Sequence, residues 1–152
     1  MNNKNSTIAL HNLEDTKKIA YQLASHTLAG DVFCMKGNIG VGKTTFCQFF
    51  IEYFLPKSTA LSPTFSIINS YDTKKFSIYH LDLYRIQNPQ ELIELGLDEI
   101  LNNNVALIEW SENLKNYFIY NPIYLTLSVQ NNIHYIDIAC SNESQFNRFF
   151  PK

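Results

Sequence analysis

One segment of the chain combines glycines, a lysine and a threonine at a fixed spacing. Residues 37–44 read Gly-Asn-Ile-Gly-Val-Gly-Lys-Thr, which matches the pattern G-x-x-x-x-G-K-[ST] of a phosphate-binding loop, or P-loop. Glycines let successive backbone N–H groups point inward at phosphate oxygens, and the start of a following helix adds more N–H donors. Lys43 would bring a positive charge to the β and γ phosphates, and Thr44 a hydroxyl ligand for Mg²⁺. The pattern predicts a nucleotide site formed by Gly37, Asn38, Ile39, Gly40, Val41, Gly42, Lys43, Thr44 and Thr45.

A magnesium-bound triphosphate also needs an acidic residue at the end of a strand beside the one that precedes the loop. The apolar run Val-Ala-Leu-Ile-Glu at 105–109 has this Walker B form, so we expect Glu109 to bind magnesium or to orient water. Asp82 is a second candidate, because His80, Asp82 and Tyr84 would share one face of a strand. Spacing alone favours a solvent-exposed surface for that face.

The hydrophobic pattern indicates the elements that would hold these residues. A helical spacing of apolar residues occurs at 13–24, 43–54 and 89–102, the last broken at Gly96. Strand patterns occur at 31–36, 65–71, 76–84, 105–108, 123–129 and 133–139. The strands at 65–71 and 76–84 would form one antiparallel hairpin, and those at 123–129 and 133–139 would form another. No element is assigned from residue 141 onward. We therefore expect an α/β fold, a mixed sheet of the P-loop NTPase type with flanking helices.

Length and composition fit one folded domain over residues 1–152. Hydrophobic residues make up 45% and charged residues 17%, which argues against disorder. The net charge is −2 and the basic residues are scattered, so we expect no direct hold on a nucleic-acid backbone. The sequence shows no signal peptide and no apolar run long enough for a membrane span, so we expect a cytoplasmic protein. The cysteines, Cys34, Cys47 and Cys140, indicate neither a zinc site nor a disulfide framework.

Several P-loop functions remain to be weighed against each other. The chain has no N-K-x-D segment for reading guanine, so ATP is the expected ligand. A small-molecule kinase needs several arginines around its second substrate, and only Arg85 and Arg148 are present. Neither is an obvious finger for the transition state, so we expect weak hydrolysis by the chain alone. A module that ATP gates without useful turnover stays open as an alternative.

Five segments in a common order resemble the TsaE (YjeE) family of bacterial P-loop ATPases, which are needed for threonylcarbamoyladenosine in transfer RNA. The resemblance extends from about Asn12 to Gln130. Its most specific parts are His-Leu-Asp-Leu-Tyr-Arg at 80–85 and Ile-Glu-Trp at 108–110. The other matching stretches are 37–46, Ser-Pro-Thr-Phe at 62–65 and Glu-Leu-Ile-Glu-Leu-Gly-Leu at 91–97.

The resemblance implies roles for individual residues and for partners. Asp82 would lie near magnesium and the γ-phosphate, Thr64 would belong to a switch-like loop over the nucleotide, and Glu109 would be the Walker B acid. A TsaB–TsaD pair would be the partner, and tRNA would be reached only through it. Asn38 and Val41 stand where the family often has an acid and an alanine, and neither change removes a phosphate ligand. The expected catalytic residues are Lys43, Asp82 and Glu109, and the expected Mg²⁺ ligands are Thr44, Asp82 and Glu109.

Overall fold

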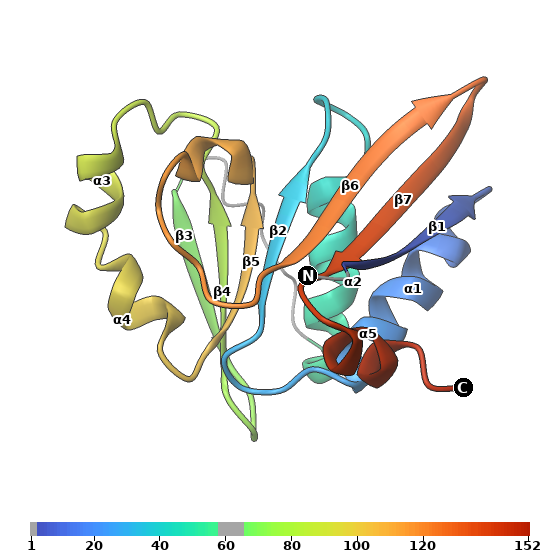
Figure 1. Cartoon of the computed structure of the whole chain (residues 1–152), viewed down its shortest axis with the longest axis horizontal. Helices are drawn as coiled ribbons and strands as arrows, with labels where there is room; N and C mark the ends of the chain where they lie inside the picture. The colour runs from blue at the N-terminus through green and yellow to red at the C-terminus, as the bar shows by residue number, and fades with distance from the viewer. Residues whose placement is uncertain (1–2, 58–65) are drawn as a thin grey trace.

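The computed structural model of the chain describes residues 3–57 and 66–152. Its described part contains a seven-stranded sheet with helices on both faces (Figure 1). The strands are β1 Lys4–Leu10, β2 Val32–Lys36, β3 Ile68–Asp72, β4 Ser77–Asp82, β5 Val105–Glu109, β6 Ile123–Gln130 and β7 Ile133–Cys140. The helices are α1 Leu13–Ser25, α2 Lys43–Phe54, α3 Pro89–Glu94, α4 Leu97–Leu101 and α5 Glu143–Phe149, with a 3₁₀ turn, η1, at Ser111–Leu114.

The sheet is mixed, and its parallel strands are central. Its order is β1-β7-β6-β2-β5-β4-β3. Strand β2 runs parallel to both β5 and β6, and β4 runs parallel to β5. The pairs β3–β4, β6–β7 and β1–β7 are antiparallel. The predicted α/β class, the mixed sheet and both hairpins are therefore confirmed.

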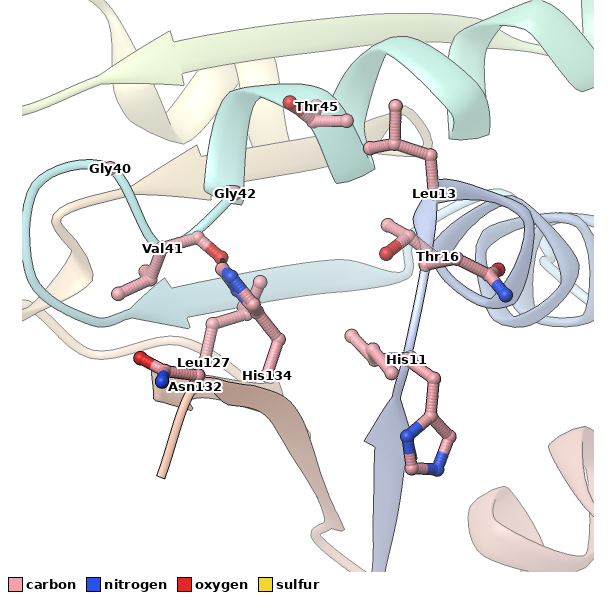
Figure 2. Close-up of a pocket in the computed structure, with 12 residues that line it drawn as sticks. His11, Leu13, Thr16, Gly40, Val41, Gly42, Thr45, Leu127, Asn132 and His134 are labelled. Atoms are coloured by element: carbon pink, nitrogen blue, oxygen red, sulfur yellow. Dashed lines mark hydrogen bonds between the residues drawn. The ribbon is translucent and has the colours of Figure 1, made fainter. Parts of the chain in front are cut away.

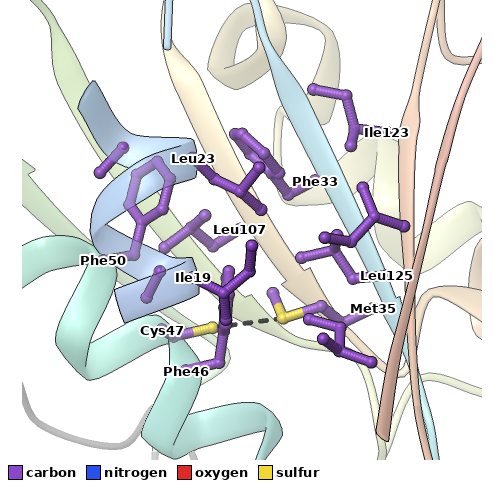
Figure 3. Packing of buried hydrophobic residues seen from close by; sticks show 14 of the residues in the cluster. Ile19, Leu23, Phe33, Met35, Phe46, Cys47, Phe50, Leu107, Ile123 and Leu125 are labelled. Atoms are coloured by element: carbon purple, nitrogen blue, oxygen red, sulfur yellow. Dashed lines mark hydrogen bonds between the residues drawn. The ribbon is translucent and has the colours of Figure 1, made fainter. Parts of the chain in front are cut away.

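Two buried clusters hold the helices to the two faces of the sheet. Helices α1 and α2 cover one face, where Met35 of β2 faces Cys47 of α2 (Figure 3). The short helices α3 and α4 cover the other face, where Leu92 and Leu97 pack against Leu81 of β4. The alternation of strand side chains thus assigns odd residues of β2 and β5 to the α2 face and even residues to the opposite face.

Three elements were not predicted from the sequence, namely β1, η1 and α5. Strand β1 lies at the edge of the sheet and consists mostly of polar residues. Residues 4–10 form a strand because they pair with β7, and their hydrophobic pattern does not indicate one. Helix α5 begins at the side chain of Asn142, which accepts a hydrogen bond from Gln145 N at 2.8 Å. Arg148 in α5 donates to both carboxylate oxygens of Asp31 at 2.8 Å, which ties this helix to the start of β2. No helix within residues 3–57 and 66–152 has the length and apolar character that a membrane span requires.

Candidate functional site

The glycine-rich loop lies between β2 and α2, at the carboxyl edge of the central parallel strands (Figure 1). Gly42 is the N-cap of α2 and has φ of 105°, a left-handed conformation that glycine adopts without a steric penalty. The loop therefore turns directly into the helix, so that the free N–H groups of the first helical turn lie next to the N–H groups of the loop. The strand–loop–helix arrangement that a phosphate site requires is present, as predicted.

Lys43 is held inside the loop by groups of the loop itself. Its side chain is buried, and its Nζ donates to the carbonyl oxygen of Gly37 and, at 3.0 Å, to that of Asn38. The same Nζ lies 4.3 Å from the centre of the Trp110 ring, within range of a cation–π contact. Burial lowers the pKa of Lys43, and the nearby carboxylate of Glu109 opposes that shift. The ammonium group of Lys43 is thus held at the loop by backbone carbonyls, which phosphate oxygens could replace as its hydrogen-bond acceptors.

The two candidate carboxylates lie side by side, because Asp82 and Glu109 are register partners at the ends of parallel strands β4 and β5. Glu109 is buried, and its Oε1 accepts a hydrogen bond from the Thr44 hydroxyl at 2.8 Å. Its Oε2 lies 2.7 Å from Nε2 of His80. Asp82 is partly exposed, and its Oδ1 accepts from the backbone N–H of Tyr84 at 2.9 Å. Sheet pairing therefore brings together acids that are far apart in the sequence.

A cavity of about 260 Å³ joins the loop to the carboxylates. Its oxygen-bearing side chains are those of Thr44, Asp82 and Glu109, together with the hydroxyl of Thr45. Hydroxyl and carboxylate oxygens are the ligands that Mg²⁺ prefers, and a lysine at the same cavity suits a polyphosphate. The residues present fit a magnesium-bound phosphate group. The full lining comprises Ile39, Gly40, Gly42, Lys43, Thr44, Thr45, Asp82, Glu109 and Trp110.

A second cavity, of about 430 Å³, opens on the other side of the loop (Figure 2). It shares Gly40, Gly42 and Thr45 with the first cavity, so the two adjoin at the loop. Val41 of the loop also lines it, and the rest of its wall comes from β1, the start of α1 and the β6–β7 hairpin, through Leu10, His11, Asn12, Leu13, Thr16, Leu127, Asn132 and His134. This mixture of apolar and polar groups next to a phosphate site is typical of a nucleoside pocket.

The structure brings most of the predicted site residues into contact. Lys43, Thr44 and Glu109 are joined through the loop and β5, and Asp82 lines the same cavity. Thr64, predicted to reach the nucleotide, lies outside the described residues. The catalytic and metal-binding roles of these residues remain predictions.

Three residues at the site were not identified from the sequence. His80 was expected on a solvent-exposed face, yet it is fully buried, because β4 lies inside the sheet and its polar side chain meets Glu109. Trp110 has φ of 56°, and its ring contacts both Lys43 and Tyr84. His134 of β7 reaches the P-loop, where its Nδ1 lies 3.2 Å from the carbonyl oxygen of Val41. His80 and Trp110 lie in the motif segments 80–85 and 108–110, and no sequence signal marked His134.

Comparison with known proteins agrees with this arrangement. The family model "Threonylcarbamoyl adenosine biosynthesis protein TsaE" matches residues 10–139. A protein of Rickettsia felis named tRNA threonylcarbamoyladenosine biosynthesis protein TsaE is 46% identical over 109 residues, which cover 71% of this chain and 64% of that protein. The match to the protein of the same name from Rickettsia prowazekii has 42% identity and covers 81% of this chain and 86% of that protein.

The fold has a solved counterpart as well. The crystal structure of YdiB from Bacillus subtilis superimposes with a TM-score of 0.79 at 25% sequence identity, covering 97% of this chain and 93% of that one. The match thus includes the sheet and the helices on both of its faces. The chain spans less than two thirds of the length of the Rickettsia felis relative. Because the family model covers most of its residues, the chain belongs to the TsaE family.

Proposed function

We propose that this protein is a magnesium-dependent ATPase that serves threonylcarbamoyladenosine modification of tRNA by acting on a TsaB–TsaD pair. The observation that carries the ATPase proposal is the contact between the P-loop and β5, in which the Thr44 hydroxyl donates to Glu109 at 2.8 Å. This contact joins the expected magnesium ligand of the loop to the expected Walker B acid. The printed names of the curated relatives support the role in tRNA modification.

The two adjoining cavities suit the two halves of a nucleotide. The cavity around Lys43 would take the phosphates, and the one between α1 and the β6–β7 hairpin would take the nucleoside. On binding, Lys43 would exchange the carbonyls of Gly37 and Asn38 for phosphate oxygens. The absence of an N-K-x-D segment favours adenine over guanine.

Thr44 and one of the two carboxylates, Asp82 or Glu109, would hold Mg²⁺, which when bound supplies positive charge against the charge that develops on the phosphates, and the other carboxylate would orient the attacking water. Since Glu109 already accepts from the Thr44 hydroxyl, we assign it to the magnesium side of the cavity. Asp82 is partly exposed and has one oxygen committed to Tyr84 N, so we assign it to orienting the attacking water. Neither arginine of the chain lines the phosphate cavity as far as the structure describes it, so slow hydrolysis without a partner follows.

The test is ATP hydrolysis by the pure protein, with and without the cognate TsaB–TsaD pair. Glu109→Ala is the matched control, because it removes the carboxylate and leaves Lys43 and the loop in place. Strong stimulation that vanishes in the variant would support a partner-dependent ATPase. A fast rate that is indifferent to the pair would refute the partner assignment. Tight ATP binding without turnover in either condition would favour the gated binding module.

A further inference from the structure

His80 is a fully buried imidazole that the proposed reaction does not use directly. It lies on β4, two residues before Asp82, and its Nε2 is 2.7 Å from Oε2 of Glu109. Its other ring nitrogen, Nδ1, is buried and has no hydrogen-bond partner among residues 3–57 and 66–152. Buried polar atoms are rarely left unpaired, because each costs free energy. Leucine would fill a similar volume without this cost, so packing alone does not account for a histidine here.

The hydrogen-bond pattern assigns the proton of the ring. A carboxylate only accepts, so the short contact with Glu109 requires a proton on Nε2. The unpaired Nδ1 is then a bare acceptor, whereas the other tautomer would leave an N–H group buried without an acceptor. Sγ of Cys47 lies within 4.8 Å of both groups, and burial raises its pKa well above the ordinary value, so it stays a neutral thiol. No thiolate therefore competes with Glu109 for the ring proton.

The two oxygens of Glu109 consequently have separate partners. Oε2 accepts from His80, and Oε1 accepts from Thr44. A carboxylate held at one oxygen cannot rotate without breaking that bond, so the other oxygen stays directed at the P-loop. Hydrogen bonds of this kind orient metal ligands in many proteins.

We propose that His80 is a positioning residue, which fixes the Glu109 carboxylate so that Oε1 faces Thr44 and the magnesium side of the phosphate cavity. This role rests on the proposed ATPase function and refines it. His80 would touch neither nucleotide nor metal, and would act only through Glu109. Its loss should therefore weaken the dependence of nucleotide binding on Mg²⁺ without affecting binding in the absence of the metal.

The experiment compares His80→Leu, which removes the donor, with His80→Gln, whose amide nitrogen can donate from nearly the same place. ATP affinity is measured over a range of Mg²⁺ concentrations and again in EDTA. In His80→Leu the half-saturating Mg²⁺ concentration should rise roughly 10-fold to 100-fold, the usual effect of removing such a partner. The affinity in EDTA should match that of the wild type. His80→Gln should restore most of the response.

Two further measurements separate positioning from a structural role. Ile78→Ala, on the same face of β4, should lower the melting temperature and leave the Mg²⁺ response unchanged. In the ligand-free protein, ¹⁵N shifts of the His80 ring should show a protonated Nε2 and an unprotonated Nδ1. A protonated Nδ1, or equal losses in the Leu and Gln variants, would overturn the role of His80. Wild-type protein without Mg²⁺-dependent ATP binding would instead overturn the proposed function.

Discussion

Replacing Gly37 by alanine would place a methyl group where the P-loop touches β6. A Cβ atom at this position would lie 2.5 Å from the carbonyl oxygen of Leu127 and 2.8 Å from Cγ2 of Val41. Leu127 is paired with Ile136 in the β6–β7 hairpin, so its backbone cannot move freely, and Val41 is itself buried. The loop would therefore have to move away from the hairpin, and with it Val41, which lines the second cavity together with Leu127 (Figure 2).

The size of the effect follows from the distances. A carbon and an oxygen in contact are normally about 3.3 Å or more apart, so the loop must shift by roughly 0.8 Å. Gly37 also has φ of 145°, where a side chain adds roughly 1–3 kcal/mol of backbone strain. The donors of a phosphate site work only at hydrogen-bond distance, and an error near 1 Å costs on the order of 100-fold in catalysis. We expect ATP affinity to fall at least about 10-fold, or 1.4 kcal/mol.

Calorimetric titration with ATP in saturating Mg²⁺ measures this change, and far-UV circular dichroism checks that the fold persists. Gly96→Ala is the matched control, because Gly96 also has positive φ, at 75°, yet has nothing within 4 Å of an added Cβ. The control should lose some stability and keep its ATP affinity. Unchanged affinity in Gly37→Ala would refute the idea that contact with β6 fixes the loop.

Three further predictions concern charge and burial. Lys43→Ala should abolish ATP turnover, because Lys43 brings the positive charge to the phosphate cavity, and a wild-type rate would contradict the mechanism. Arg148→Ala should lower the free energy of unfolding in urea by about 2 kcal/mol, since two charged hydrogen bonds to Asp31 are lost, and Arg148→Lys should recover only part. Burial raises the pKa of Cys34 to about 12 and that of Cys140 to about 11. These thiols should therefore resist Ellman's reagent at pH 8 in the native protein and react after unfolding. A fast reaction in the native protein would disprove their burial.

The site was predictable from the sequence where local pattern determines structure. The P-loop motif specifies its own strand, turn and helix, and an apolar run that ends in Glu109 specifies a buried strand. Short helices broken at Gly96 were predicted as well, and Gly96 adopts the positive φ that ends α3. In each case the backbone conformation depends on residues within a few positions of one another.

The features of the fold and the site that were not predicted depend on neighbouring residues that lie far away in the sequence. The polar alternation in β4 predicts an exposed face for His80, but α2 covers that face, and β3 and β5 flank β4 within the sheet. Strand β1 has too few apolar residues to be recognised alone, and its pairing with β7 supplies its hydrogen bonds. The contact of Thr44 with Glu109 requires the order of strands, which hydrophobic pattern does not contain.

The pairing of β2 also affects when the nucleotide site can form during folding. Val32 pairs with Ala106, and Phe33 pairs with Ile123, so both neighbours of this strand come from the second half of the chain. Pairings of long sequence separation form slowly, because the entropy of closing the intervening loop is lost before contacts compensate for it. During synthesis, β2 and the P-loop have no strand beside them until β5 and β6 have left the ribosome. Nascent chains that end before Val105 should therefore be unable to bind ATP, and the site would be completed among the last parts of the molecule.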